Sequence, residues 1–301
     1  MRMLDLNGNQ RPDFYVAGVS DSALDTKIAL LLDNGSGGFK APAELTVPNL
    51  YPGLVTAGDF DGDGNVDFAV VGSPLPADVC CTVQVLRGTA GGGYGTPQAI
   101  TFPGGHTVDY LTALTSRDLD GDGKADLILG GDFKSMGGAT DTGIMFARGT
   151  ASGFGNETLV STNFDPADIH IADLNRDQKL DIVAISDANG VNNRIYSLLG
   201  NGNATFQGLR SFTLPLSEPS YFSIADINLD SNLDLVSCST NNPGLIISMG
   251  DGLGGFMTGQ TVTVPQNPSN VATADVNGDG HPDLLVPFED LAPVRIQLNT
   301  P

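Results

Sequence analysis

The chain has 301 residues, and 35 acidic residues against 14 Lys and Arg give it a formal net charge of −21. This excess of acid argues against partners such as nucleic acid or an anionic membrane surface, both of which attract clustered basic residues. Hydrophobic residues make up 40% of the chain and charged residues only 16%, which predicts a folded core. No apolar run is long enough to insert into a membrane, and residues 1–10 lack the apolar core of a signal peptide.

One acidic segment recurs six times along the chain. The copies are DLNGNQRPDFYVA (5–17), DFDGDGNVDFAVV (59–71), DLDGDGKADLILG (118–130), DLNRDQKLDIVAI (173–185), DINLDSNLDLVSC (226–238) and DVNGDGHPDLLVP (275–287). The first Asp residues of successive copies are 54, 59, 55, 53 and 49 residues apart. A near-constant step of this length indicates a repeat architecture, in which each copy marks one structural unit.

A glycine-rich turn and an aromatic residue follow each of the first five acidic segments. The turns lie in LLDNGSGGF (31–39), LRGTAGGGYG (86–95), FARGTASGFG (146–155), LLGNGNATF (198–206) and SMGDGLGGF (248–256). Alternating stretches such as TVTVP (261–265) come next, and apolar stretches such as GLVTAGDF (53–60) precede the acidic segments. Because such alternation is typical of strands, each unit is predicted to hold four of them.

Repeated four-stranded units predict an all-β fold, a β-propeller of antiparallel blades. We expect residues 1–301 to form a single propeller domain, with units that begin near residues 5, 59, 118, 173, 226 and 275. The first unit is expected to lack most of its inner strand and the last to lack its outer strand. Six visible repeats leave two alternatives open, a six-bladed ring or part of a seven-bladed one. One aromatic core anchor per blade is expected at Phe39, Tyr94, Phe154, Phe206 and Phe256.

Oxygen donors recur at positions 1, 3, 5 and 9 of each acidic loop, and a backbone carbonyl at position 7 is expected to help. Hard oxygen ligands in a flexible loop suit Ca²⁺. An EF-hand would need Glu at position 12, where this chain continues into a strand. The expected metal ligands are Asp5, Asn7, Asn9 and Asp13; Asp59, Asp61, Asp63, Asn65 and Asp67; Asp118, Asp120, Asp122, Lys124 and Asp126; Asp173, Asn175, Asp177, Lys179 and Asp181; Asp226, Asn228, Asp230, Asn232 and Asp234; and Asp275, Asn277, Asp279, His281 and Asp283.

The number of carboxylates predicts how strongly each loop binds calcium. Loops two and three carry four Asp each and are expected to be the strongest sites, whereas loop one, with two Asp and with Gln10 at position 6, is expected to be the weakest. Two carboxylates about 5 Å apart repel by roughly 3 kcal/mol at an effective dielectric constant near 20, so a loop without a cation should protonate or open. The alternative, a solvated turn that favours Asp, Asn and Gly, explains one loop better than six in register.

The pattern D-x-[DN]-x-[DN]-G-x-x-D, followed by an apolar strand, a glycine turn and Phe, resembles the FG-GAP/VCBS-type repeats of integrin α-subunit propellers and their bacterial relatives. Loops one, four and five depart from it at position 6, where they have Gln10, Gln178 and Ser231. The resemblance implies a propeller with structural calcium in the loops, on the face away from ligands. The family includes adhesion receptors, lectins and a few polysaccharide lyases, so the resemblance alone does not define the function.

Outside the acidic loops the sequence contains no nucleophile elbow, phosphate-binding loop or paired-His motif, which predicts a protein that is not an enzyme. His170 is expected to be structural, and Cys80, Cys81 and Cys238 are expected to be small buried thiols; a vicinal disulfide would be strained. The connections opposite the calcium loops vary between units and are expected to carry recognition. The ligand-binding candidates there are Tyr51, His106, Tyr110, Lys134 and Met136.

We therefore expect an extracellular or surface-exposed propeller that is stabilised by up to six Ca²⁺ ions and binds a protein or glycan ligand without turnover. The extracellular location follows from the millimolar calcium that sites of modest affinity need. Two alternatives remain. A carbohydrate-active enzyme such as a polysaccharide lyase would need a cleft with convergent Lys, Arg, Tyr or His, and the absence of Trp weakens it. The other alternative is a structural spacer within a larger surface protein.

Overall fold

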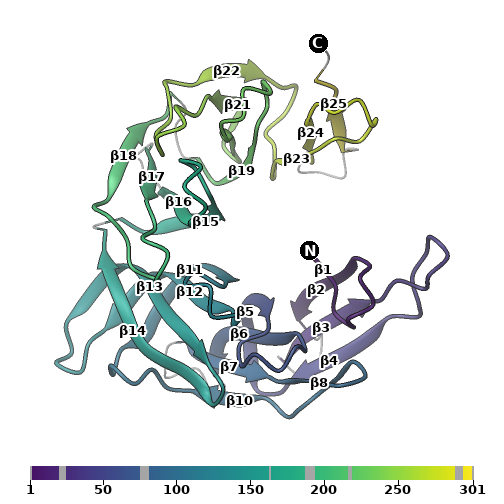
Figure 1. Ribbon diagram of the computed structural model, residues 1–301, viewed down its shortest axis with the longest axis vertical. Helices are drawn as coiled ribbons and strands as arrows, with labels where there is room; N and C mark the ends of the chain where they lie inside the picture. Colours follow the sequence, from purple (N-terminus) through teal and green to yellow (C-terminus); the bar gives the residue numbers. More distant parts are fainter. Residues whose placement is uncertain are drawn as a thin grey trace. The chain divides into compact units, whose positions relative to one another are not determined.

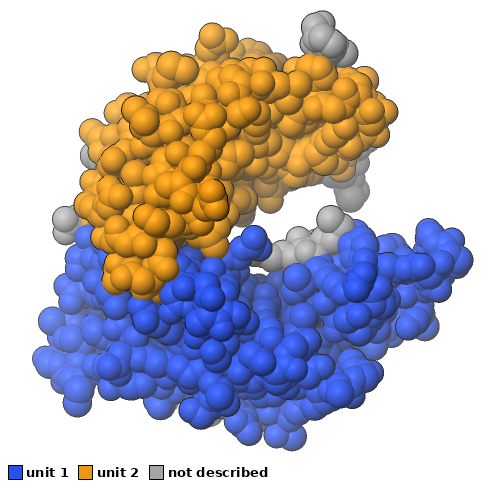
Figure 2. Space-filling model, viewed as in Figure 1, with its two compact units in different colours: residues 1–161 blue, residues 162–301 orange. Residues whose placement is uncertain are grey.

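A computed structural model describes residues 2–19, 25–74, 81–162, 164–186, 194–215, 219–288 and 294–299. These residues form strands β1 to β25 and no helix, which confirms the all-β prediction. Accordingly, the described part of the chain holds no helix that is long and apolar enough to cross a membrane. The chain divides into two compact units, Met1–Ser161 and Thr162–Pro301, which Figure 2 shows in different colours. The single-domain organisation stays a prediction.

The first unit contains three four-stranded antiparallel sheets, each built in chain order (Figure 1). The first sheet consists of β1 (Arg2–Leu4), β2 (Asp13–Val19), β3 (Thr26–Leu31) and β4 (Ala43–Val47). The second consists of β5 (Leu50–Gly58), β6 (Asp67–Pro74), β7 (Thr82–Leu86) and β10 (Gln98–Ile100), with a two-residue hairpin of β8 (Gly88–Thr89) and β9 (Gly93–Tyr94) between the last two. The third consists of β11 (Thr107–Arg117), β12 (Asp126–Lys134), β13 (Thr140–Thr150) and β14 (Gly153–Ser161).

The second unit repeats this pattern. Its first sheet consists of β15 (Pro166–Ala172), β16 (Asp181–Ser186), β17 (Arg194–Leu198) and β18 (Arg210–Thr213). The next consists of β19 (Tyr221–Ala225), β20 (Asp234–Ser239), β21 (Asn242–Ser248) and β22 (Gln260–Thr263). The last has three described strands, β23 (Ala272–Ala274), β24 (Asp283–Val286) and β25 (Arg295–Gln297). The predicted four-stranded unit is therefore present in five sheets of the described residues. In the first of them β1 has only three residues, and the last sheet has three described strands.

The core of each unit lies between consecutive sheets. In the first unit, Val71 and Val83 of the second sheet belong to the same buried cluster as Leu129 and Met145 of the third. The strand after the acidic loop is strongly buried in the second to fifth sheets, and all six residues of β16 and of β20 are buried. Face-to-face burial of successive four-stranded sheets is the packing mode of a propeller.

The predicted aromatic anchors differ in burial: Phe154 and Phe256 are buried, Tyr94 and Phe206 are half-buried, and Phe39 is exposed. Phe154 is buried against Phe60, which lies in acidic loop two of the preceding repeat, with ring centroids 5.3 Å apart. Phe39 is 45% exposed, and its ring centroid lies 5.3 Å from that of Phe14 in its own sheet. The expectation of one core anchor in every blade is therefore wrong for Phe39.

Candidate functional site

Each acidic loop is shaped by its own side chains. In loop two, Gly64 N–H donates to Asp59 Oδ2 (2.8 Å), Asp63 N–H donates to Asp61 Oδ1 (3.2 Å), and Asn65 N–H donates to Asp63 Oδ1 (2.8 Å). The same three bonds, from position 6 to 1, from 5 to 3 and from 7 to 5, recur in the other five loops. They turn the side chains at positions 1, 3 and 5 inward, as the alternation predicts.

The loop backbone is left-handed at two positions. Gly62 and Gly64, at positions 4 and 6 of loop two, have φ angles of 78° and 85°. Loop four adopts the same conformation without glycine, with φ of 60° at Arg176 and 65° at Gln178. Left-handed backbone is costly for residues with a Cβ atom, so the surrounding hydrogen bonds must hold these residues in place. The sequence motif predicted a left-handed residue at position 6, but it did not predict the left-handed residue at position 4.

The Asp at position 9 is a buried anchor in every loop. Asp181 is fully buried, and it accepts Leu174 N–H at Oδ2 and Gly200 N–H at Oδ1, both at 2.8 Å. One carboxylate thus ties the start of the loop to the turn after the third strand. Equivalent pairs of bonds are made by Asp13, Asp67, Asp126, Asp234 and Asp283. The motif predicted this residue only as a metal ligand.

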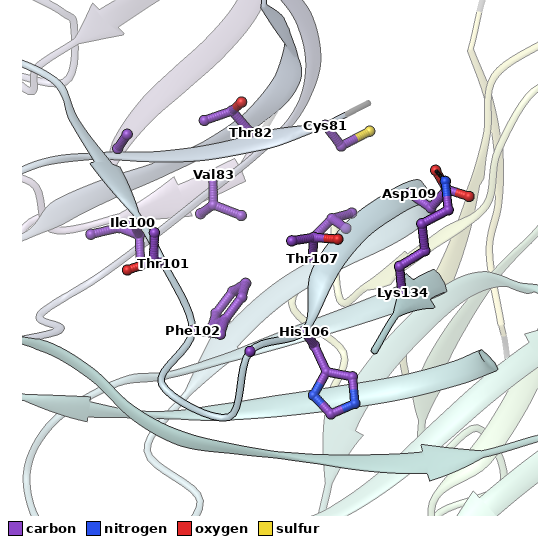
Figure 3. A pocket seen from close by; sticks show the side chains of 13 residues that line it. Cys81, Thr82, Val83, Ile100, Thr101, Phe102, His106, Thr107, Asp109 and Lys134 are labelled. Atoms are coloured by element: carbon purple, nitrogen blue, oxygen red, sulfur yellow. Dashed lines mark hydrogen bonds and ion pairs between the residues drawn. The ribbon is translucent and has the colours of Figure 1, made fainter. Parts of the chain in front are cut away.

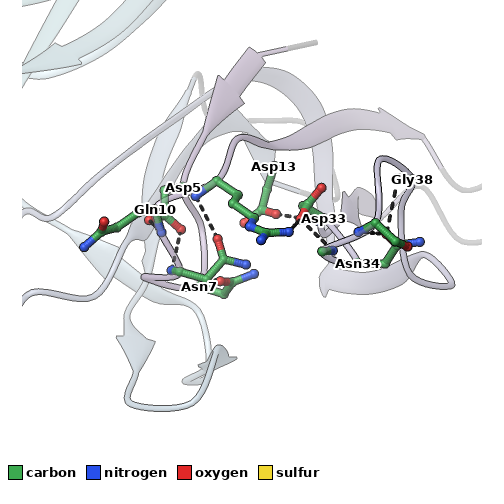
Figure 4. A network of polar contacts seen from close by, with 11 residues as sticks. Asp5, Asn7, Gln10, Asp13, Asp33, Asn34 and Gly38 are labelled. Carbon is green, nitrogen blue, oxygen red and sulfur yellow. Dashed lines mark hydrogen bonds and ion pairs between the residues drawn. The ribbon is translucent and has the colours of Figure 1, made fainter.

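Loop one has the same structure although it has the fewest carboxylates (Figure 4). Asp5 accepts Gln10 N–H at 2.6 Å, and Asp13 accepts Asp33 N–H at 2.7 Å. Arg11, at position 7, forms a 3.2 Å ion pair with Asp33 in the following turn. The fold of the loop therefore needs only the anchoring bonds and not four acidic residues.

Three carboxylates converge in each of loops two and three. Asp59, Asp61 and Asp67 in loop two each bring one oxygen within 4.8 Å of the others, and Asp118, Asp120 and Asp126 do so in loop three. Burial raises the pKa of Asp126 to about 6 and also raises the pKa of Asp67, because it penalises the charged form of each carboxyl group. Hard, converging oxygens of this kind fit Ca²⁺.

The position-5 carboxylates lie outside these groups of three. In loop three, the Lys124 ammonium contacts Asp122 at 2.9 Å, and this hydrogen bond lowers the pKa of Asp122. In loop four, Lys179 makes a similar contact with Asp177 at 3.5 Å. Of the four carboxylates predicted as ligands in loop three, the structure thus brings three together and gives the fourth an ammonium partner.

Two arginines that the motif did not indicate lie beside the convergent carboxylates. Arg87 Nη1 is 2.7 Å from Asp67 Oδ2 and 3.4 Å from Asp61 Oδ2. Arg148 Nη1 is 3.5 Å from Asp120 Oδ2. Each arginine directly precedes the glycine whose N–H donates to the position-9 Asp. This place in the repeat is the sequence feature from which the contact could have been predicted.

A pocket of about 540 Å³ opens in the first unit between its second and third sheets (Figure 3). Its apolar wall includes Val83, Ile100 and Phe102, and its polar groups include Asp109 and Lys134, which lie at the other end of the pocket in Figure 3. The Lys134 ammonium forms a 2.6 Å ion pair with Asp109.

A buried glutamate fixes one wall of this pocket. The Glu157 side chain on β14 is fully buried, and it accepts hydrogen bonds from Gly104 N–H (2.8 Å), His106 N–H (3.1 Å) and the His106 ring at Nδ1 (2.9 Å). Burial acts to raise the pKa of Glu157, but the hydrogen bonds from His106 and Gly104 outweigh it and lower this pKa. The turn between β10 and β11 is therefore held by a carboxylate that sequence reasoning did not single out.

Two of the five predicted ligand residues, His106 and Lys134, line this pocket. Met136 is 87% exposed and lies against Gly105 of the pocket wall, and Tyr110 is 58% exposed beside Asp109 in the chain. Tyr51 lines a separate cavity of about 80 Å³. The pocket lies at the Thr107 end of β11, whereas loop three follows Arg117 at the other end, so in this blade ligand residues and acidic loop lie at opposite strand ends.

The remaining histidine and cysteine predictions have simple outcomes. The His170 ring lies 4.4 Å from the ring of Phe222, in agreement with a structural role. Cys238 is buried and free, and burial raises the pKa of its thiol to about 12. Cys81 is half-buried and lines the pocket, whereas Cys80 lies outside the described residues.

The FG-GAP-like repeat family matches residues 5–70, 118–184, 173–237 and 226–286 of this chain. These segments make up most of the sequence and contain all six acidic loops. The protein therefore belongs to the FG-GAP-like repeat family, and its architecture is that of a β-propeller. No curated protein matches the chain.

Solved propeller structures are similar to the chain at low sequence identity. An Agrocybe aegerita lectin, described as specific for non-reducing terminal N-acetylglucosamine, is 16% identical over 95% of this chain and 80% of its own, with a TM-score of 0.58. The lectin BP39L of Burkholderia pseudomallei is 12% identical over 99% and 82%, with a TM-score of 0.64. BBS1N, solved in complex with ARL6DN, is 12% identical over 99% and 76%, with a TM-score of 0.55. At these identities the likeness shows a common fold.

Proposed function

We propose that this FG-GAP propeller is a non-catalytic carbohydrate-binding protein that is stabilised by calcium and acts outside the cell. The observation that carries the proposal is the pocket of about 540 Å³ in the first unit. Ligand sites of this size are typically apolar with a few fixed polar groups. A sugar ring has an apolar face and a polar edge. The apolar face would pack against Val83 and Phe102, and the polar edge would face the ion pair of Asp109 and Lys134.

The charge of the site favours a neutral sugar. Lys134 is paired with Asp109 and His106 is hydrogen-bonded to Glu157, so the pocket offers polar groups whose charges are largely balanced. The chain as a whole carries a formal charge of −21, which repels polyanions. Two of the similar structures are lectins, and this agrees with a saccharide ligand.

Calcium would have a structural role in this proposal. The convergent carboxylates of loops two and three would hold the ion, and a bound cation would offset the repulsion between groups such as Asp118, Asp120 and Asp126. Loop three and the pocket are associated with opposite ends of β11, so the ion would support the blade without touching the sugar. Millimolar calcium outside the cell would fill sites of modest affinity.

The proposal is tested by a glycan array at millimolar calcium with the wild-type protein and two tryptophan variants. Thr107→Trp places a bulky side chain on an exposed residue that lines the pocket, and Thr261→Trp makes the same change on an exposed residue of β22, outside it. We expect neutral glycans to bind the wild type and Thr261→Trp but not Thr107→Trp. Loss of viscosity in a polysaccharide solution would instead support an enzyme, and a protein-only ligand would contradict the sugar assignment.

A further inference from the structure

The six repeats fall into two kinds at two coupled positions. Position 3 of the acidic loop is Asp in repeats two and three and Asn in the other four. The residue before the turn is Arg in those same two repeats and Leu or Met elsewhere. The paired residues are Asn7 with Leu32, Asp61 with Arg87, Asp120 with Arg148, Asn175 with Leu199, Asn228 with Met249, and Asn277 with Leu298.

The structure shows why the two positions vary together. Arg87 Nη1 is 3.4 Å from Asp61 Oδ2 and also donates to the buried Asp67 at 2.7 Å. Arg148 Nη1 approaches Asp120 Oδ2 at 3.5 Å. Asp61 and Asp67 belong to the group of three carboxylates that converge in loop two, so the guanidinium contacts oxygens that a metal ion would also use.

We propose that Arg87 and Arg148 are internal counter-ions that replace part of the charge of a divalent cation in loops two and three. In repeat two, four carboxylates and Arg87 leave the same three net negative charges that the Asp residues of loops five and six carry. In repeat three, Arg148 and Lys124 together reduce four negative charges to two. The fourth Asp therefore does not make loops two and three stronger calcium sites. The arginine stabilises the empty loop and weakens its affinity for calcium.

Leucine is the natural replacement for this arginine. The carbonyl of Arg87 accepts Gly95 N–H at 2.8 Å, and the carbonyl of Leu199 accepts Gln207 N–H at the same distance in the fourth repeat. The local backbone is therefore the same with either side chain. Arg87→Leu combined with Asp61→Asn would convert repeat two into the kind found in repeat four.

The test is a double-mutant cycle of Asp61→Asn and Arg87→Leu. Site-specific calcium affinity is read from the amide NMR signal of Gly64 in loop two, with that of Gly123 in loop three as the internal control, and stability is read from melting curves in excess chelator. We expect Arg87→Leu to raise the affinity at Gly64 at least about tenfold, because a unit charge beside a divalent ion is removed. The same variant should melt at a lower temperature in chelator, and the double variant should return to wild type in both measurements.

An unchanged or weaker affinity at Gly64 in Arg87→Leu, or a double variant whose affinity differs from that of wild type as much as that of Arg87→Leu does, would overturn the inference. Its affinity arm rests on the proposed calcium binding. If the wild-type Gly64 signal does not respond to calcium, the calcium proposal fails by itself. The melting curves in chelator still test the counter-ion role, which a variant as stable as wild type would contradict.

Discussion

Replacing Asp181 by alanine tests whether the position-9 Asp is an anchor of the fold independently of any metal. This carboxylate is fully buried and accepts two backbone N–H groups at 2.8 Å, from Leu174 at the start of loop four and from Gly200 after β17. Alanine removes both acceptors and leaves two buried donors without partners. The segments that these bonds join are 26 residues apart, between Leu174 and Gly200, so no neighbouring bond replaces them.

The size of the effect follows from the two bonds and the buried charge. Hydrogen bonds to a charged group contribute about 1.5–3 kcal/mol each. Burial raises the pKa of Asp181, because removing the charged carboxylate from water is unfavourable. This desolvation penalty reduces the net stabilisation that the two hydrogen bonds provide. Removing one partner of a buried charged network typically costs about 3–5 kcal/mol, and we expect a loss in this range for Asp181→Ala.

The assay is chemical unfolding in excess chelator at neutral pH, where calcium cannot contribute. Asp177→Ala is the matched control, because this position-5 residue is exposed at the loop surface and its main bond is to Lys179 N–H at 3.0 Å. The control should lose less than about 1 kcal/mol. A loss below about 1 kcal/mol for Asp181→Ala as well would refute the anchoring role and would leave this Asp as a metal ligand only.

Three further outcomes are expected. Chelating calcium should lower the melting temperature of the wild type, because a ligand that binds only the folded state stabilises it, and an unchanged melting curve would count against structural calcium. Gln178→Gly should raise the free energy of unfolding by about 0.5–1 kcal/mol, since φ there is 65°, whereas a loss would show that the side chain is needed. The pKa of Glu157 is lowered below 4.5, so its contribution is complete above that pH and is lost as the pH falls through the folded-state pKa. The stability gap between wild type and Glu157→Gln should therefore shrink on acidification, and a constant gap would contradict this assignment.

Much of the fold could be predicted because each repeat carries the same local information. The alternation in TVTVP and the acidic segment DFDGDGNVDFAVV each act over a few residues, and the observed strands β22 and β6 lie where these patterns predict them. The burial of Phe39 could not be predicted this way, because it depends on whether a neighbouring sheet covers the residue. Local patterns do not contain that information.

The candidate sites show the same division. The inward-facing side chains at positions 1, 3 and 5 follow from turn chemistry, and the sequence predicts them correctly. The contacts of Arg87 with Asp67 and of Glu157 with His106 join residues that are 20 and 51 positions apart. They depend on strand register, so a motif confined to nine residues cannot reveal them.

The most direct test of the proposed function is an NMR titration of the calcium-loaded protein with the neutral sugar that binds best on the array. Specific binding in the pocket should shift the amide signals of Val83, Phe102 and Val108, which line it, and leave those of Gly64 and Gly123 in the acidic loops unchanged. Shifts confined to the acidic loops, or the absence of shifts at millimolar sugar, would contradict the account.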